Sequence, residues 1–94
     1  MPPHIALLVN PVSGRRRAAV TAVRLKQALR DAGARVHVYT GRSASDSRRM
    51  ARLAASDNPD ALVAVGGDGL VHQALQGVVG TGVPLAVVPT GTGN

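Results

Sequence analysis

The stretch Val65-Gly66-Gly67-Asp68-Gly69-Leu70-Val71-His72 decides the fold expected for this chain. Residues 61–65, which lead into the glycines, are aliphatic without alternation, as in a short parallel strand buried on both faces. Apolar residues return at helical spacing after the glycines, so we expect a helix over residues 70–79. In α/β folds, a strand, a glycine turn and a helix start together form a place where phosphates bind.

The acid within this turn narrows the kind of ligand. A carboxylate repels a phosphate unless a cation lies between them, whereas it readily accepts hydrogen bonds from hydroxyls. Asp68 therefore favours a nucleotide bound with Mg²⁺, or a sugar hydroxyl, over a bare anion site.

The rest of the chain continues the alternation of strands and helices. Further strands are expected at residues 4–10, 35–40 and 84–88, and further helices at residues 16–32 and about 45–56. Apolar and polar residues alternate over residues 35–40, which indicates a strand nearer the edge of the sheet. Short connections in the order βαβαβαβ predict a three-layer, mainly parallel α/β sheet of the Rossmann-like kind, within one domain.

Helical spacing also predicts which side chains face the core. Those of the first long helix are Ala18, Ala22, Leu25, Leu29 and Ala32, and those of the second are Met50, Leu53 and Ala54. Gly33 is expected to end the first of these helices in the left-handed conformation, and Ser43 or Ser45 to cap the second.

Composition limits the class of protein. The absence of cysteine excludes a disulfide framework and a thiolate metal site. Aliphatic runs of about five residues fall far short of the roughly 20 that a membrane helix needs. The N-terminal residues lack the basic region and apolar length of a signal peptide, so we expect a soluble, cytoplasmic chain.

The charge of the chain favours anionic partners. The formal net charge is +6, and ten of the eleven basic residues are arginines. Nucleotide phosphates, an acidic membrane surface or nucleic acid would each suit this charge, although a solvated arginine-rich surface explains it equally well. Tyr39 is the sole aromatic residue. The chain thus has almost no aromatic side chains on which bases could stack, and no specific nucleic acid is expected as a partner.

Three loops fall where strands of a parallel sheet would end, at residues 10–14, 66–69 and 91–94. Each offers backbone N–H groups or small hydroxyls without bulky side chains. Any one of them is explained as an ordinary turn, for which Gly, Asn and Ser are usual. All three at the same edge of the sheet favour a phosphate site.

Other motifs for nucleotide binding, metal binding or catalysis are absent from the sequence. A P-loop requires a lysine after its last glycine, but Lys26 lies inside the expected first helix. The dinucleotide-binding motif requires a third glycine where His72 stands. His4, His37 and His72 show no metal-ligand spacing, so none of them is expected to be a metal ligand. The five acids offer no catalytic pair of carboxylates.

The three loops together resemble the catalytic domain of the diacylglycerol kinase family, which includes bacterial soluble lipid kinases and sphingosine kinases. The resemblance rests on Asn10-Pro11-x-Ser13-Gly14, Gly66-Gly67-Asp68-Gly69 and Pro89-x-Gly91-Thr92-Gly93-Asn94. The second of these elements is shared with NAD kinases and phosphofructokinases, and the other two make the lipid-kinase branch more specific. The match runs the length of the chain but covers the N-terminal, nucleotide-binding part of the family's domain, so residues 1–94 are expected to be a fragment.

The resemblance implies an enzyme that transfers the γ-phosphoryl group of ATP to a lipid hydroxyl with Mg²⁺, diacylglycerol being the first candidate substrate. The nucleotide-site residues that it implies are Asn10, Ser13, Gly14, Thr40, Gly67, Asp68, Gly69, Leu70, Val71, His72 and Thr92. Asp68 would be the catalytic residue of this stretch and would handle Mg-ATP, directly or through water. The general base is expected in a C-terminal β-rich domain outside residues 1–94, so this stretch alone is expected to be inactive.

Leu70, His72 and Gln73 depart from the family, which usually has Thr at the first of these positions and Asn-Glu at the other two. Two alternatives therefore stay open: an NAD kinase-like enzyme, and a non-catalytic module that binds a nucleotide or an anionic membrane. The expected partners are ATP and a lipid at a membrane surface, with peripheral attachment at the inner membrane face. A homodimer is a further alternative.

Overall fold

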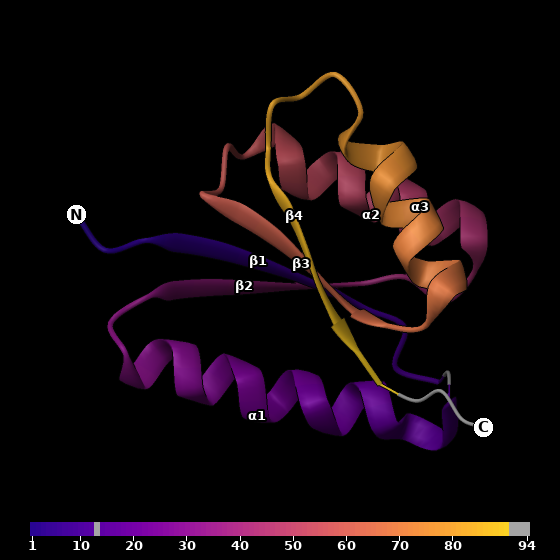
Figure 1. Ribbon diagram of the computed structural model, residues 1–94, viewed down its shortest axis with the longest axis horizontal. Helices are drawn as coiled ribbons and strands as arrows, with labels where there is room; N and C mark the ends of the chain where they lie inside the picture. The colour runs from indigo at the N-terminus through magenta and orange to yellow at the C-terminus, as the bar shows by residue number, and fades with distance from the viewer. Residues whose placement is uncertain (13, 91–94) are drawn as a thin grey trace.

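The computed structural model of the chain describes residues 1–12 and 14–90 (Figure 1). Its elements, in chain order, are β1 (His4–Val9), the short 3-10 turn η1 (Gly14–Arg16), α1 (Arg17–Asp31), β2 (Arg35–Thr40), α2 (Ala44–Ser56), β3 (Ala61–Gly66), α3 (Asp68–Val78) and β4 (Leu85–Pro89). The strands and helices alternate where the sequence pattern predicts them. The largest difference is that α3 begins at Asp68, two residues before the predicted start.

The four strands form one parallel sheet in the order β2-β1-β3-β4. Helix α1 covers one face of this sheet, and α2 and α3 cover the other, which gives three layers (Figure 1). The predicted α/β fold is confirmed. The alternating strand β2 lies at an edge as expected, with Val36 buried and Val38 40% exposed.

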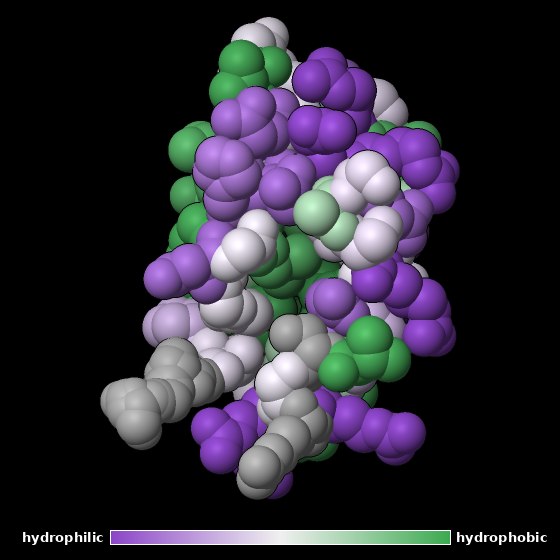
Figure 2. Space-filling view, turned by 90° about the vertical axis from the view of Figure 1, so that its right-hand side faces the viewer, coloured by the Kyte–Doolittle hydropathy of each residue, from purple (hydrophilic) through white to green (hydrophobic). Residues whose placement is uncertain are grey.

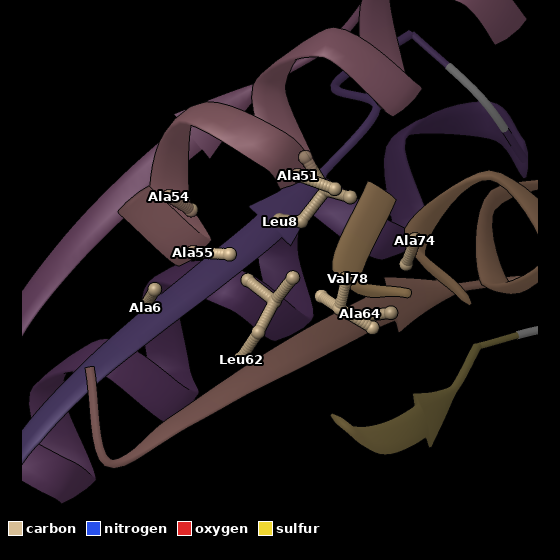
Figure 3. Close-up of a cluster of buried hydrophobic side chains, with 9 residues drawn as sticks. All are labelled: Ala6, Leu8, Ala51, Ala54, Ala55, Leu62, Ala64, Ala74 and Val78. Carbon is tan, nitrogen blue, oxygen red and sulfur yellow. The ribbon is translucent and has the colours of Figure 1, made fainter. Parts of the chain in front are cut away.

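The core on the α2/α3 side is built largely from small residues. It combines side chains of β1 and β3 with side chains of the two helices (Figure 3): Ala6, Leu8, Leu62, Ala64, Ala51, Ala54, Ala55, Ala74 and Val78. Alanines allow both helices to lie close to the sheet and to each other. The closest approach is at Gly77, where an added Cβ would lie 2.5 Å from the Cβ of Ala51 and 2.9 Å from the carbonyl oxygen of Arg48.

The core on the α1 side uses the alternate residues of the same strands. Leu7, Val9, Val63 and Val65 pack there with Val36 of β2, against Ala18 and Ala22 of α1. Leu25 and Leu29 are partly buried against this cluster. Both faces of β1 and β3 are covered, so residues 5–9 of β1 and 61–65 of β3 are apolar throughout and lack alternation.

Two predicted core residues are solvent-exposed. Ala32 follows the last turn of α1, beyond the part of the helix that lies on the sheet. Leu53 is 50% exposed because the buried stripe of α2 runs through Ser47, Ala51, Ala54 and Ala55. The capping predictions are confirmed, with Ser43 capping α2 through a hydrogen bond from the Asp46 N–H, and with Gly33 at a φ of 98°.

Among the described residues, no helix is both long and apolar enough to cross a membrane.

Candidate functional site

The strand order creates a crevice at the carboxyl edge of the sheet. From the neighbouring strands β1 and β3, the chain leaves toward β2 on one side and toward β4 on the other. The loops after β1 and β3 therefore diverge, and in open α/β sheets ligands bind where this happens. Asn10 follows β1 at this point and Gly67 follows β3.

A hollow of about 300 Å³ lies at this crevice. It is lined by Asn10, Ser43, Ala44, Ser47, Gly67, Gly69, Leu70 and Gln73. Figure 2 faces the same edge and shows apolar surface at the bottom of a depression between polar side chains. The side chains that line the hollow carry no formal charge, so a charged ligand there would rely on backbone dipoles and on charged groups at the rim.

The first turn of α3 supplies such dipoles. Gly67 is the N-cap residue and provides no side-chain cap, and the first helical hydrogen bond runs from the Val71 N–H to the Gly67 carbonyl at 3.1 Å. The N–H groups of Asp68, Gly69 and Leu70 come before that bond and have no acceptor within the helix. The neighbouring helix α2 differs, because Ser43 accepts a hydrogen bond from the Asp46 N–H at 3.1 Å. Of these two helix starts, that of α3 is the one without a side-chain cap.

The glycines of this turn lack side chains for different reasons. A Cβ added at Gly66 would lie 2.9 Å from a methyl carbon of Leu70, so the Leu70 side chain would have to shift to make room for it. A Cβ added at Gly67 or Gly69 would meet no protein atom within 4 Å. Gly67 also has an extended backbone, with φ −97° and ψ −171°, that any residue adopts. The protein itself therefore does not require glycine at position 67, and its absent side chain leaves space at the hollow.

Asn10 shapes the other wall of the hollow. Its Oδ1 accepts a hydrogen bond from the Val12 N–H at 3.1 Å, which closes a small turn directly after β1. Gly14 begins η1 in the left-handed region with φ 58°. Ser13 and Thr92, which the resemblance also assigns to the nucleotide, lie outside the described residues.

Asp68 and His72 are exposed and do not line the hollow. Because they are four residues apart in α3, their side chains share a face of the helix. Within the described part of the chain, no salt bridge involves Asp68. Val71 is half-buried and packs on the α2/α3 core, so its contribution to the site is its backbone.

The structure separates Thr40 from the other candidates. Thr40 pairs with Val9, whose side chain belongs to the α1 side of the sheet. It lines a second hollow of about 220 Å³, together with Val9, Pro11, Ala19, Ala22, Val23, Lys26 and Val38. This second hollow is on the opposite face of the sheet from α2 and α3.

Sequence reasoning missed Ser43, Ala44, Ser47 and Gln73 as lining residues. Ser43 was predicted only as a helix cap, and Ser47 is buried where Gly41 leaves room for it. The sequence did contain a signal for the residues at the start of α2, because the loop that follows β2 also lies at the carboxyl edge of the sheet.

The first turn of α2 also holds an ionised carboxylate. A hydrogen bond from Arg49, and then one from the Arg42 N–H, lower the pKa of Asp46 and keep it ionised.

Comparison with known proteins decides the family. A sequence model described as the diacylglycerol kinase catalytic domain matches residues 4–94. The chain belongs to this family. The kinase resemblance seen in the three loop motifs is thereby confirmed.

Individual relatives of this family agree with that assignment. Diacylglycerol kinases of two Mycobacterium tuberculosis strains, CDC 1551 / Oshkosh and ATCC 25618 / H37Rv, are 38% identical to the chain over 90 residues. These matches cover 96% of this chain and 29% of the relatives. Sphingosine kinase B of Dictyostelium discoideum is 26% identical over 97 residues, which is 96% of this chain and 13% of that protein.

The fold of the family is shared as well. Two solved structures of proteins assigned as a diacylglycerol kinase from Bacillus anthracis str. Sterne match with TM-scores of 0.78 and 0.79, at 26% identity. They cover 97% of this chain, and the chain covers 32% of each of them. The chain thus spans about a third of the length of the diacylglycerol kinases that it matches.

Proposed function

We propose that the chain is the nucleotide-binding part of an ATP-dependent lipid kinase. In the complete protein, the γ-phosphoryl group of ATP would pass to a lipid hydroxyl, with diacylglycerol as the first candidate. The observation that carries this proposal is the start of α3, where three N–H groups without helical acceptors border a hollow that Gly67 and Gly69 leave open. Family membership supplies the reaction class.

The residues of the hollow suit a phosphate chain. The N–H groups of Asp68, Gly69 and Leu70 would donate hydrogen bonds to phosphate oxygens, and the helix dipole would favour the negative charge. Asn10 would close the site from the β1 side. Ser13, Gly14 and Thr92 keep the roles that the resemblance implies, whereas Thr40 would have to act from the other face of the sheet.

Asp68 suits the metal of a nucleotide complex. Mg²⁺ retains several waters and binds proteins through one or two carboxylates together with substrate phosphates. An exposed carboxylate at the rim, beside the N–H groups, has the right chemistry to hold hydrated Mg²⁺, directly or through water. When bound, the ion would neutralise charge on the phosphates during transfer. His72, on the same helix face as Asp68, would lie at the rim near the nucleotide.

In the transfer itself, the lipid hydroxyl oxygen forms a bond to the γ-phosphorus, and the bond from that phosphorus to the bridging oxygen breaks. ADP leaves with the electron pair of that bond, and a general base takes the hydroxyl proton. We place this base in a C-terminal β-rich domain beyond residues 1–94. The role of the present residues is then to position ATP and neutralise its charge, the two contributions that matter most in phosphoryl transfer. We therefore expect residues 1–94 alone to be inactive.

The partners follow from this proposal. They are ATP and a lipid presented at a membrane surface, which suits a cytoplasmic protein attached peripherally to the inner membrane face. The net positive charge of +6 would favour such a surface if it is anionic. Neither nucleic acid nor a homodimer is needed for the chemistry.

One observation favours a second function. Leu70 and Gln73, which depart from the usual family residues, both line the hollow. A nucleotide-binding module without catalysis would keep the N–H groups of α3 and tolerate these changes. An NAD kinase-like activity has no such observation in its favour, and the family assignment argues against it.

The full-length protein with Mg-ATP labelled at the γ-phosphate decides among these functions. We expect label to pass to diacylglycerol in lipid micelles, and not to NAD. Asp68→Asn should lower the rate by about 10², the scale at which lost charge stabilisation of a transition state is felt. Asp31→Asn, at the far end of α1, is the matched control and should retain the rate. Full transfer of label by Asp68→Asn would contradict the role of Asp68. Nucleotide binding without any transfer of label by the wild-type protein would support the non-catalytic module.

A further inference from the structure

A second group of chemically active side chains lies away from the hollow, toward the amino ends of the strands. His4 is the first residue of β1, His37 is in β2, and Asp57 follows the last residue of α2. The His4 Nε2 atom is 3.3 Å from His37 Nδ1 and 3.8 Å from Asp57 Oδ2, and His37 Nδ1 is 3.9 Å from the same oxygen. Three potential metal-ligand atoms, from β1, β2 and the residue after α2, therefore lie within 4.8 Å of one another.

The fold holds these residues in place. The Asp60 carboxylate accepts a hydrogen bond from the His4 N–H at 2.8 Å, and the Asp60 N–H donates to the His4 carbonyl at 2.7 Å. The parallel pairing of β1 with β2 sets His37 beside Ala6, two residues along from His4. Asp57 is fixed by its N–H, which donates to the Ala54 carbonyl at 3.2 Å.

The separation of the two imidazole nitrogens matches that of two ligands of a small tetrahedral ion. Ligands about 2.0–2.1 Å from a tetrahedral Zn²⁺ are roughly 3.3 Å from one another, whereas neighbouring ligands of octahedral Mg²⁺ are only about 3.0 Å apart. The two imidazole nitrogens already have the tetrahedral separation. The Asp57 oxygen is farther from both nitrogens than this, but its side chain is 57% exposed and can move inward.

The donor set selects the class of metal. Two imidazoles and one carboxylate suit Zn²⁺ and similar transition metals, while Mg²⁺ prefers oxygen ligands throughout. The His4 side chain is 10% exposed and that of His37 is 60% exposed, so the cluster is open to solvent on one side. A water molecule can therefore complete the tetrahedron. A plain hydrogen bond between the two histidines would also give this distance between their nitrogens, and the metal competition described below separates the two explanations.

We propose that His4, His37 and Asp57 form a Zn²⁺ site. It joins the start of β1, the edge strand β2 and the end of α2, at the opposite end of the strands from the nucleotide hollow. Its role is to fasten the edge strand and the C-terminal end of α2 to the centre of the sheet. This proposal is independent of the kinase function, because it requires no nucleotide.

Metal competition on the full-length protein tests this site. At about pH 7.5, where histidine is mostly neutral, the protein competes with a chromophoric chelator for Zn²⁺. We compare His37→Gln with His72→Gln, an exposed histidine on α3 that serves as the matched control. His37→Gln should weaken the affinity of one Zn²⁺ equivalent at least about tenfold, since even outer contacts of a metal site cost 10–100-fold. His72→Gln should leave it unchanged, and an excess of Mg²⁺ should not displace the ion.

Two further readouts separate metal binding from folding. Zn²⁺ should raise the melting temperature of the wild type and of His72→Gln, but not that of His37→Gln. Co²⁺ in place of Zn²⁺ should give the visible absorption of a tetrahedral ion, and His37→Gln should remove it. Equal Zn²⁺ affinity of the two variants, or displacement by Mg²⁺, would overturn the proposal and leave a simple hydrogen bond between the histidines.

Discussion

Gly66 and Gly67 are neighbours that lack a side chain for opposite reasons. At Gly66 the side chain of Leu70 occupies the space that a Cβ would need and would have to shift. At Gly67 the space is open, and the backbone is one that any residue adopts. A sequence shows both as glycine. The structure therefore separates a glycine that is covered by a neighbouring side chain from one whose space is available to a ligand.

This difference predicts that a capping side chain at position 67 would stabilise the protein and weaken nucleotide binding. In Gly67→Ser, the hydroxyl can cap α3 by accepting a hydrogen bond from one of the N–H groups that we assign to the phosphates. We expect the protein to become more stable by up to about 0.5 kcal/mol, since serine is slightly better than glycine at this position. Mg-ATP should bind at least about tenfold more weakly, a loss of about 1.4 kcal/mol.

Thermal denaturation and calorimetric titration of the full-length protein measure the two effects. Ser45→Gly, in the first turn of α2, is the control for an exposed serine–glycine exchange and should leave ATP affinity unchanged. Unchanged affinity in a stable Gly67→Ser protein would remove the start of α3 from the nucleotide site.

At the scale of elements, the contact of α2 with α3 depends on one small residue. The Gly77 position faces Ala51 and the Arg48 carbonyl, and neither backbone can move without shifting a helix. Gly77→Ala should therefore destabilise the protein by about 1–3 kcal/mol, the usual cost of overpacking, despite the better helix propensity of alanine. Gln76→Ala, one residue earlier and exposed, should change the free energy of unfolding by no more than about 0.5 kcal/mol. Urea denaturation of both variants measures this, and equal stabilities would contradict the close packing.

Most elements could be predicted because their apolar residues recur at the period of a strand or a helix. Leu53 was misplaced because the buried stripe of α2 consists of small residues and includes a serine, Ser47, so the largest apolar residue was a misleading guide. Thr40 illustrates the same limit for the site. Strand ends were predicted, but alternate residues of a strand point to opposite faces, and Thr40 lies on the α1 face with Val9.

At the scale of the whole molecule, the strand order explains the candidate site. The sequence predicted the loops after β1 and β3 but not that these loops are adjacent. Their adjacency depends on β1 and β3 being neighbours at the centre of the sheet. Sequence periodicity carries no information on strand order. The same order brings the start of α2 to the hollow, which is why Ser43, Ala44 and Ser47 were missed. Likewise, His4, His37 and Asp57 are far apart in the sequence and meet only through the pairing of β1 with β2.

Two hollows flank the carboxyl edge, one under α2 and α3 and one under α1, and only the first is bordered by the free N–H groups of α3. Hydrogen–deuterium exchange of the full-length protein, with and without Mg-ATP, tells them apart most directly. The N–H groups of residues 68–70 have no helical acceptors, so they should exchange fast without nucleotide. We predict that Mg-ATP slows exchange over residues 66–72 and leaves residues 19–26 unchanged. Slower exchange at residues 19–26, with none at residues 66–72, would contradict the placement of the nucleotide at the start of α3.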